Sequence, residues 1–223
     1  DKKMSLFNIG LIGCGHWGPN YIRNFQIPSV STVITCVDKE PERLVQMKRL
    51  YPEINVDQDL EALLKDPHVQ AVVIATPAST HYSLVKAALQ RGKDVLCEKP
   101  LALTVKECDE LLELARLEQR ILMVGHTFVY NSGIQVLKKY VDEGLLGQIY
   151  YIHSTRTNLG PIRSDVNAIF DLATHDFSIF NYLLSSTPLN VSARGHCSLR
   201  HDLEDIGFVT CSYPNHVLTH VHV

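Results

Sequence analysis

The sequence predicts an α/β protein: a doubly wound parallel sheet in the first half, followed by an α+β domain with a mostly antiparallel open sheet. Three observations support this prediction. Short apolar runs alternate with amphipathic helical patterns over the first 124 residues, as βαβ units require. A glycine-rich turn follows the first apolar run. In the last third, β-branched runs follow one another with no helix between them, which favours antiparallel neighbours.

The first half contains five predicted strands, and a predicted helix follows each of the first four. Pro41 suits the first turn of one helix and Gly92 closes another. Apolar runs predict strands at 6–12, 32–37, 69–75, 94–97 and 121–124, and helical periodicity predicts helices at about 17–26, 41–50, 60–65, 79–91 and 104–119. We therefore expect one domain over residues 1–124, built on a parallel sheet that helices cover on both faces.

The second half, residues 125–223, has a different pattern. Helices are predicted at 132–143 and 171–184, a long strand at 148–157, a loop at 158–168, and successive strands at 190–199, 205–213 and 216–223. This order predicts helices packed on one sheet. The last run is still alternating at Val223, so we expect the natural chain to continue.

Composition excludes several classes of protein. The 223 residues carry 21 basic and 24 acidic side chains, a net charge of −3, with 45% apolar residues. Disorder and nucleic-acid binding through bulk positive charge are therefore not expected. No apolar run reaches membrane-spanning length, residues 1–7 lack the apolar core of a signal peptide, and the six cysteines form no C-x-x-C pair. We expect a cytoplasmic protein without a metal site.

The turn after the first strand has the pattern G-x-G-x-x-G, formed by Gly13, Gly15 and Gly18. Its glycines permit a tight turn, a close approach of the backbone to a pyrophosphate, and contact between helix and strand. The exposed N–H groups and the helix dipole would hold the phosphates. The position between a strand and a helix makes the motif informative, and it adds His16 and Trp17 to the expected cofactor contacts.

Asp38 ends the second strand, where a carboxylate can accept hydrogen bonds from both ribose hydroxyls of adenosine. Its charge would repel a 2′-phosphate, so the sequence favours NAD over NADP. Arg43 and Lys39 lie close enough in sequence to keep NADP as the less favoured cofactor. The alternative for Asp38 is a solvated turn residue.

Two further loops follow strands at the same edge. Ala75-Thr76-Pro77 precedes a helix that contains His81 and can line the nicotinamide half of the crevice, although Ser79 or Thr80 can also cap that helix. Glu98-Lys99-Pro100 follows the next strand, and its proline permits a cis peptide bond that would fix the direction of Lys99.

Asp171 and His175 are four residues apart in a predicted helix, so their side chains share one face. A carboxylate there can orient an imidazole that accepts a hydroxyl proton. A purely structural histidine is the alternative reading, and Lys99 as a third partner weighs against it. His220 and His222 alternate on one strand face as two metal ligands would, but no third ligand is evident.

These motifs together resemble the Gfo/Idh/MocA family of NAD(P)-dependent sugar and polyol oxidoreductases, with Glu98-Lys99-Pro100 as the most specific element. The resemblance implies a Rossmann domain and a C-terminal α/β domain whose open sheet forms a homodimer or homotetramer. It also implies that Thr76, Pro77, His81 and Glu98 contact the cofactor. Lys99 would polarise the substrate oxygen, His175 would act as general acid and base, and Asp171 would orient one of them. Relatives are usually about half as long again.

The substrate is expected to meet residues that follow the last strand of the first half and residues of the second half. Tyr130 and Asn131 are candidates, with Asn131 as a helix cap the alternative. Within the family, residues 156–172 resemble a subgroup that acts on nucleotide sugars, such as UDP-N-acetyl-hexosamine or hexuronate 3-dehydrogenases. Arg156, Asn158 and Arg163 are therefore further substrate candidates, since a guanidinium matches a carboxylate or diphosphate; ordinary surface positions are the alternative.

The sequence thus predicts an NAD-dependent dehydrogenase that oxidises a secondary hydroxyl of a sugar or nucleotide sugar to a ketone. Lys99, Asp171 and His175 would converge beside the reactive carbon of the dinucleotide. A glycoside hydrolase that oxidises C3 transiently and a non-catalytic NAD-binding regulator are the alternatives. The exact substrate, the direction of the reaction and the oligomer size do not follow from the sequence.

Overall fold

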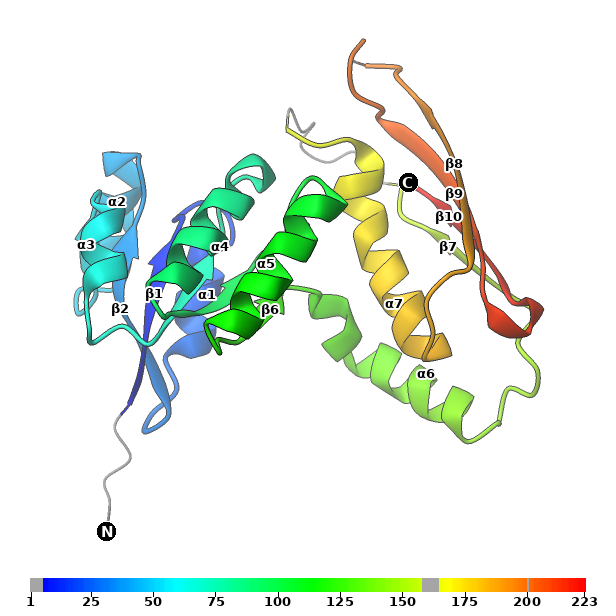
Figure 1. Cartoon of the computed structure of the whole chain (residues 1–223), viewed down its shortest axis with the longest axis horizontal. Helices are drawn as coiled ribbons and strands as arrows, with labels where there is room; N and C mark the ends of the chain where they lie inside the picture. Colours follow the sequence, from blue (N-terminus) through cyan, green and yellow to red (C-terminus); the bar gives the residue numbers. More distant parts are fainter. Residues whose placement is uncertain (1–5, 158–164, 200) are drawn as a thin grey trace. The chain divides into compact units, whose positions relative to one another are not determined.

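The computed structural model describes residues 6–157, 165–199 and 201–223. The contacts divide the chain into two units, Asp1–Gly125 and His126–Val223. No helix among these described residues is long and apolar enough to cross a membrane. Figure 1 shows the helices and strands of both units.

The first unit is built on a six-stranded sheet in the order β3-β2-β1-β4-β5-β6, with all neighbours parallel. Its strands are β1 (Phe7–Ile12), β2 (Ser31–Val37), β3 (Asn55–Asp57), β4 (Ala71–Ile74), β5 (Asp94–Cys97) and β6 (Leu122–Val124). Its helices are α1 (Gly18–Phe25), α2 (Pro41–Leu50), α3 (Leu60–Lys65), α4 (His81–Gln90) and α5 (Val105–Leu117), and a 3₁₀ turn, η1 (Ala78–Thr80), precedes α4. This is the doubly wound sheet that the sequence predicts. β3 was not expected, because its three residues include only one apolar side chain, Val56.

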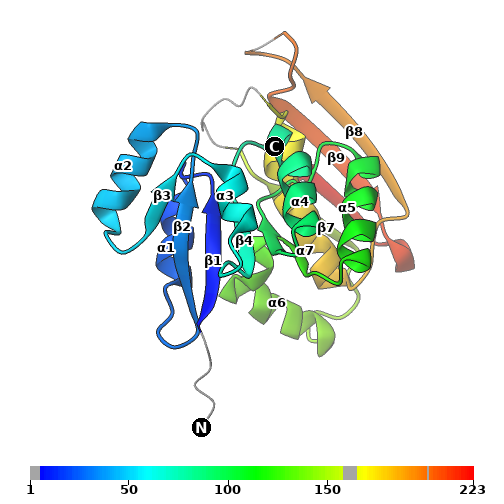
Figure 2. The ribbon, with the colours of Figure 1, turned by 60° about the vertical axis from the view of Figure 1, so that its left-hand side comes forward.

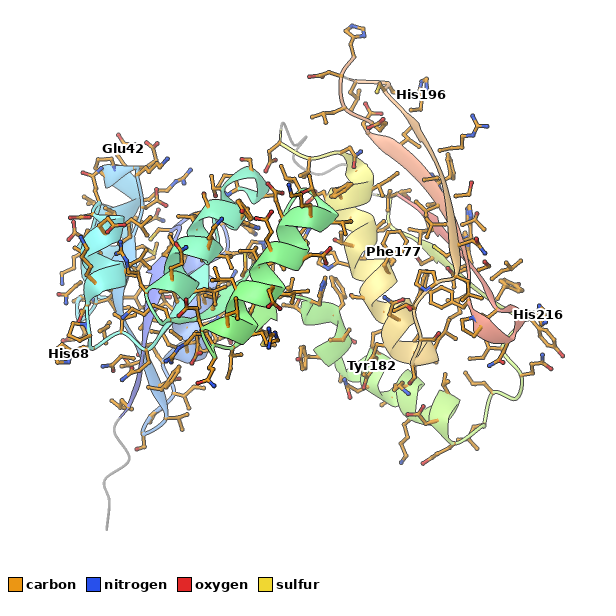
Figure 3. The ribbon with its side chains drawn as sticks, in the orientation of Figure 1. Glu42, His68, Phe177, Tyr182, His196 and His216 are labelled. Atoms are coloured by element: carbon orange, nitrogen blue, oxygen red, sulfur yellow. The ribbon has the colours of Figure 1, made fainter. Side chains whose placement is uncertain are left out.

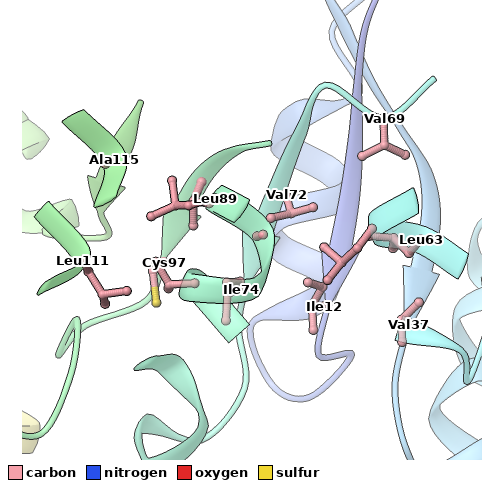
Figure 4. Close-up of a cluster of buried hydrophobic side chains, with 14 residues drawn as sticks. Ile12, Val37, Leu63, Val69, Val72, Ile74, Leu89, Cys97, Leu111 and Ala115 are labelled. Atoms are coloured by element: carbon pink, nitrogen blue, oxygen red, sulfur yellow. The ribbon is translucent and has the colours of Figure 1, made fainter. Parts of the chain in front are cut away.

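Both faces of this sheet are buried, and the alternation along β1 shows how. Ile9 and Leu11 pack with α1 and α2, whereas Ile12 packs with α3, α4 and α5 on the opposite face. Figure 4 shows the second of these clusters, in which Val72 and Ile74 of β4 meet Leu89 and Leu111. Successive side chains of a strand point to opposite faces, so a continuous apolar run is required where helices cover both faces.

The carboxyl ends of five strands meet at one edge of the sheet. In the strand register, Ile12 lies beside Val37 and Ile74, Cys97 lies beside Ile74, and Val124 beside Cys97. The residues that follow these strand ends therefore share the edge: Gly13, Asp38, Ala75, Glu98 and Gly125. The strand order reverses between β1 and β4, and ligands of such sheets bind at this point of reversal.

The second unit has a four-stranded mixed sheet in the order β7-β10-β9-β8. Its elements are η2 (Thr127–Tyr130), α6 (Ser132–Asp142), β7 (Tyr151–Thr155), a π-helix η3 (Ile169–Ala173), α7 (Thr174–Leu184), β8 (Asn190–His196), β9 (Ile206–Ser212), η4 (Pro214–His216) and β10 (Leu218–His222). β8, β9 and β10 are antiparallel neighbours as expected, whereas β7 joins β10 in parallel. The predicted 171–184 helix starts two residues earlier, with the π turn.

The helices α6 and α7 cover one face of this second sheet, as both Figure 1 and Figure 2 show. Val209, Cys211 and Val221 point inward to Phe180 of α7. The opposite face carries exposed side chains, among them Tyr151, Phe208 and Leu218. Alternate residues of β9 and β10 are therefore buried and exposed, as in a sheet with one covered face.

Candidate functional site

The glycine loop after β1 has the geometry of a phosphate cradle. Gly13 has a φ of +96°, and a Cβ atom there would lie 2.7 Å from the carbonyl oxygen of Ala75. A Cβ at Gly18 would lie 3.1 Å from the carbonyl oxygen of Gly13. For a Cβ atom added at Gly15, by contrast, the nearest heavy atom is Nη1 of Arg43 at 4.0 Å. Gly13 is thus required by the protein's own packing and Gly18 is tightly packed, whereas Gly15 leaves space above the backbone.

The residues between these glycines are exposed. Trp17 is 51% exposed, and its ring meets the His16 ring edge-on at 5.6 Å between centroids. The N-terminus of α1 begins at Gly18, directly after them. An open glycine beside a helix N-terminus fits the pyrophosphate of a dinucleotide.

Asp38 is anchored to this loop. Its Oδ2 accepts a hydrogen bond from the backbone N–H of Cys14 at 2.6 Å, and its Oδ1 accepts one from the N–H of Glu40 at 2.9 Å. The guanidinium of Arg43 lies 3.5 Å from Oδ2, with about half of the Arg43 side chain exposed. A negative charge is therefore fixed at the end of β2, which fits the ribose hydroxyls of adenosine.

The loop after β4 is held by its own side chains. The hydroxyl group of Thr80 donates to the carbonyl oxygen of Pro77, and the hydroxyl oxygens of Thr76 and Thr80 lie 2.7 Å apart. His81 begins α4 and is only 1% exposed. Both of its ring nitrogens lie within hydrogen-bond distance of backbone carbonyl oxygens, so the imidazole has no nitrogen left for direct contact with a cofactor.

The Glu98-Lys99-Pro100 turn follows β5, and its Lys99–Pro100 peptide bond is cis. The hydroxyl of Tyr21 in α1 donates a hydrogen bond to Glu98 Oε1, and Glu98 Oε2 accepts one from the backbone N–H of Lys99 at 3.3 Å. Burial, together with the hydrogen bond to Glu98, raises the pKa of Tyr21, so the phenol stays a donor. Tyr21 was not identified from the sequence, although it follows Gly18 by one helical turn.

The second unit places Asp171 and His175 on consecutive turns. Asp171 lies inside the π-helix Ile169–Ala173, and His175 is the second residue of α7. π turns in helices frequently occur at functional sites. The Nδ1 atom of His175 is buried, and the imidazole packs against the ring of Phe128 with 4.7 Å between centroids.

Arg156 and Asp176 form a partly buried ion pair, and Arg156 shares the contact with Phe128. Arg156 Nε and Nη2 donate to the two carboxylate oxygens of Asp176 at 3.1 and 3.2 Å. The Asp176 side chain is 5% exposed and that of Arg156 is 24% exposed. The guanidinium also lies over the Phe128 ring, 4.6 Å from its centroid. Phe128, which the sequence did not single out, therefore contacts both Arg156 and His175.

The other expected substrate residues have different surroundings. Asn131 caps α6, since its Oδ1 accepts from the backbone N–H groups of Gly133 and Ile134 at 2.9 and 3.4 Å. Tyr130 is 66% exposed. Both line an open hollow of about 220 Å³ together with Thr127 and Phe128. Asn158 and Arg163 lie outside the residues that the structure describes.

Within the described ranges, no group of three or more His, Cys, Asp or Glu side chains is arranged to hold a metal ion. His220 and His222, which alternate on β10, pack instead with aromatic neighbours. The rings of His153 and His220 stack at 5.4 Å, and those of Phe208 and His222 at 4.4 Å.

Comparisons with known proteins give a consistent result for both units. Residues 7–126 match the model of an oxidoreductase family with an NAD-binding Rossmann fold, GFO/IDH/MocA, and residues 134–223 match the C-terminal domain model of that family. An inositol 2-dehydrogenase of Pseudomonas fluorescens is 32% identical over 210 residues, 88% of this chain and 62% of the relative. A myo-inositol 2-dehydrogenase of Thermotoga maritima is 27% identical over 90% of this chain and 62% of its own length.

A solved structure shows the same fold. An oxidoreductase from Agrobacterium radiobacter in complex with NAD⁺, L-tartaric acid and magnesium superposes with a TM-score of 0.89 at 21% identity, over 98% of this chain and 66% of that one. The chain therefore spans less than two thirds of the length of these relatives.

Proposed function

Because the chain belongs to the Gfo/Idh/MocA oxidoreductase family, we propose that it takes part in the NAD-dependent oxidation of a secondary hydroxyl group to a ketone. The observation that carries this proposal is the glycine loop with Asp38 bonded to the N–H of Cys14 at 2.6 Å. Gly13, Gly15 and Gly18 would hold the pyrophosphate and Asp38 the ribose. When bound, the oxidised nicotinamide accepts a hydride from the substrate carbon.

We assign the proton chemistry to three side chains. The Lys99 ammonium donates a hydrogen bond to the substrate oxygen and polarises it. His175 takes the hydroxyl proton as the C–H bond yields its hydride, which leaves a ketone, a reduced cofactor and one proton on the imidazole. Asp171 orients one of these two groups. The support is the π turn that carries Asp171 and the ring contact that fixes His175 on Phe128.

We propose a cyclic polyol or a related sugar as the substrate class. The curated relatives named above are inositol dehydrogenases and not nucleotide-sugar dehydrogenases. Arg156, one of the residues on which the nucleotide-sugar expectation depended, already has its guanidinium paired with Asp176. A nucleotide sugar is therefore the second candidate, and direct comparison of myo-inositol with UDP-N-acetylglucosamine as substrates separates the two.

Reduced cofactor formed at saturating NAD is the test of the proposed reaction. We expect Lys99→Ala and His175→Ala each to lower the rate by about 10²- to 10⁴-fold, as loss of a general acid or base does. Lys106 and His196 are exposed, and His196 lies on β8 (Figure 3), so Lys106→Ala and His196→Ala are the matched controls. Unchanged rates in the first two variants would refute the assigned roles. Substrate turnover without net formation of NADH would favour the alternative of a glycoside hydrolase that oxidises C3 only transiently.

We also propose that the uncovered face of the second sheet associates with a second copy of the chain. Tyr151, Phe208 and Leu218 are 73%, 43% and 51% exposed on this face, and Tyr151 lies beside Leu218 in the strand register. Neighbouring exposed apolar side chains mark interaction surfaces. Light scattering after size exclusion should give a dimer or tetramer mass, and Phe208→Glu should reduce it. A monomer at every concentration would contradict the proposal.

A further inference from the structure

His81 bridges two loops at the carboxyl edge of the first sheet. Its Nδ1 lies 2.7 Å from the carbonyl oxygen of Pro100, and its Nε2 lies 2.9 Å from the carbonyl oxygen of Thr76. Thr76 follows β4 and Pro100 follows β5, and these strands are paired with Ile74 beside Cys97. The imidazole thus connects the Thr76 loop to the turn that carries Lys99.

The two partners restrict the protonation of this ring. A backbone carbonyl oxygen only accepts hydrogen bonds, and a neutral imidazole has one N–H donor and one acceptor nitrogen. Both contacts are hydrogen bonds only if both ring nitrogens carry protons; otherwise one contact opposes two lone pairs. We propose that His81 is a buried imidazolium that acts as a positioning residue for Lys99.

The burial of His81 requires that its polar atoms be satisfied. The residue is 1% exposed, so a charge on its ring carries a desolvation cost that its hydrogen bonds must offset. The two carbonyl oxygens provide one acceptor for each N–H, and hydrogen bonds with a charged donor are stronger than neutral ones. Each ring proton therefore has a partner within the fold.

This bridge fixes the backbone of Lys99 from its C-terminal side. On the other side, Glu98 is held by the hydroxyl of Tyr21. The Lys99 main chain is therefore anchored through the residue before it and the residue after it, by side chains from α1 and α4. A lysine has four rotatable side-chain bonds, so a fixed backbone is what limits the positions its ammonium can reach. This inference rests on the proposed role of Lys99 in catalysis.

The protonation of His81 can be measured without any reaction. Long-range ¹H–¹⁵N correlation spectra at about pH 7.5 separate protonated from unprotonated ring nitrogens, and an unperturbed imidazole is mostly neutral at that pH. The His81 signals are assigned by their loss in His81→Gln. His68, an exposed residue at the periphery of the first unit (Figure 3), is the control through His68→Gln. We expect two protonated ring nitrogens for His81. One unprotonated nitrogen would overturn the proposal.

The positioning role has its own test. Trp17 is the only tryptophan and lies in the glycine loop, so its fluorescence reports NAD binding. We expect His81→Phe to keep the Kd for NAD within about twofold and to lower kcat by about 100-fold, as misplacement of a catalytic group does. His81→Asn, whose amide replaces the Nδ1 donor toward Pro100, should recover about tenfold of this loss.

The outcomes separate the two proposals. Wild-type kcat in a folded His81→Phe protein would refute the positioning role. If His81→Phe does not fold, equal kcat values for His81→Asn and His81→Gln would refute it, because only the first keeps the donor toward Pro100. If the wild-type protein transfers no hydride, the proposed function fails, whereas the NMR result on the imidazolium still stands.

Discussion

Two substitutions in the glycine loop should affect different properties. Gly13→Ala should lower the stability of the protein, whereas Gly15→Ala should lower its affinity for NAD. Gly13→Ala places a Cβ 2.7 Å from the Ala75 carbonyl oxygen at a φ of +96°. Left-handed backbone costs a non-glycine residue about 1–2 kcal/mol, and overpacking against neighbouring atoms costs about 1–3 kcal/mol. We expect Gly13→Ala to lower the free energy of unfolding by about 2–5 kcal/mol.

Gly15→Ala meets no protein atom nearer than 4.0 Å from its Cβ. Replacement of glycine by alanine at a tolerated position stabilises a protein by about 0.4–1 kcal/mol, because the unfolded chain loses freedom. The free energy of unfolding should therefore be unchanged or slightly higher. The added methyl group occupies the space proposed for the pyrophosphate, so NAD affinity should fall by about tenfold or more, which is about 1.4 kcal/mol.

Urea unfolding followed by circular dichroism measures the stability of both variants, and the fluorescence of Trp17 measures their NAD affinity. Gly144→Ala serves as a control for the backbone effect alone, since Gly144 has a φ of +69° with no atom near its Cβ and lies outside the first unit. An unchanged Kd for NAD in Gly15→Ala would refute the cradle. Equal unfolding free energies for Gly13→Ala and wild type would refute the packing argument.

Three other predictions concern the side chains of Asp176, Asp38 and Tyr213. Asp176→Asn leaves Arg156 without its carboxylate partner. Because about a quarter of the Arg156 side chain is exposed, the free energy of unfolding should fall by about 2–3 kcal/mol. Glu143→Gln, in an exposed ion pair, should lower it by about 0.5 kcal/mol or less, and equal losses in urea titrations would contradict this prediction. Asp38→Ser removes the charge that opposes a 2′-phosphate, so the ratio of kcat/KM for NADP to that for NAD should rise at least about tenfold; an unchanged ratio would refute the role of Asp38. Burial raises the pKa of Tyr213 to about 12. The unfolded state therefore loses the phenol proton first, and the stability of the protein should decline from about pH 10 to 12. Tyr213→Phe should show a shallower decline in urea midpoints over that range, and the same slope as wild type would exclude Tyr213 as the cause.

The local pattern of the sequence predicted five of the six strands of the first sheet and the edge at which the candidate cofactor residues lie. Continuous apolar runs such as Ile9–Ile12 require burial on both faces, and the parallel order brings the ends of such strands to one edge. Gly13, Asp38 and Glu98 could therefore be placed together from their positions just after strands. The glycine pattern predicted a phosphate-binding turn there because its steric requirements involve only the backbone.

Contacts between distant residues were decided only by the tertiary structure. Spacing predicts neither that His81 has two carbonyl partners nor that Tyr21 reaches Glu98 across 77 positions. Arg156, which the sequence analysis named as a substrate candidate, is paired with Asp176. The π turn at Asp171 and the parallel pairing of β7 with β10 were also not predicted. Sequence periodicity specifies which face of an element is buried, whereas the partner of a polar side chain depends on how separate elements pack and which donors and acceptors that packing leaves to be satisfied.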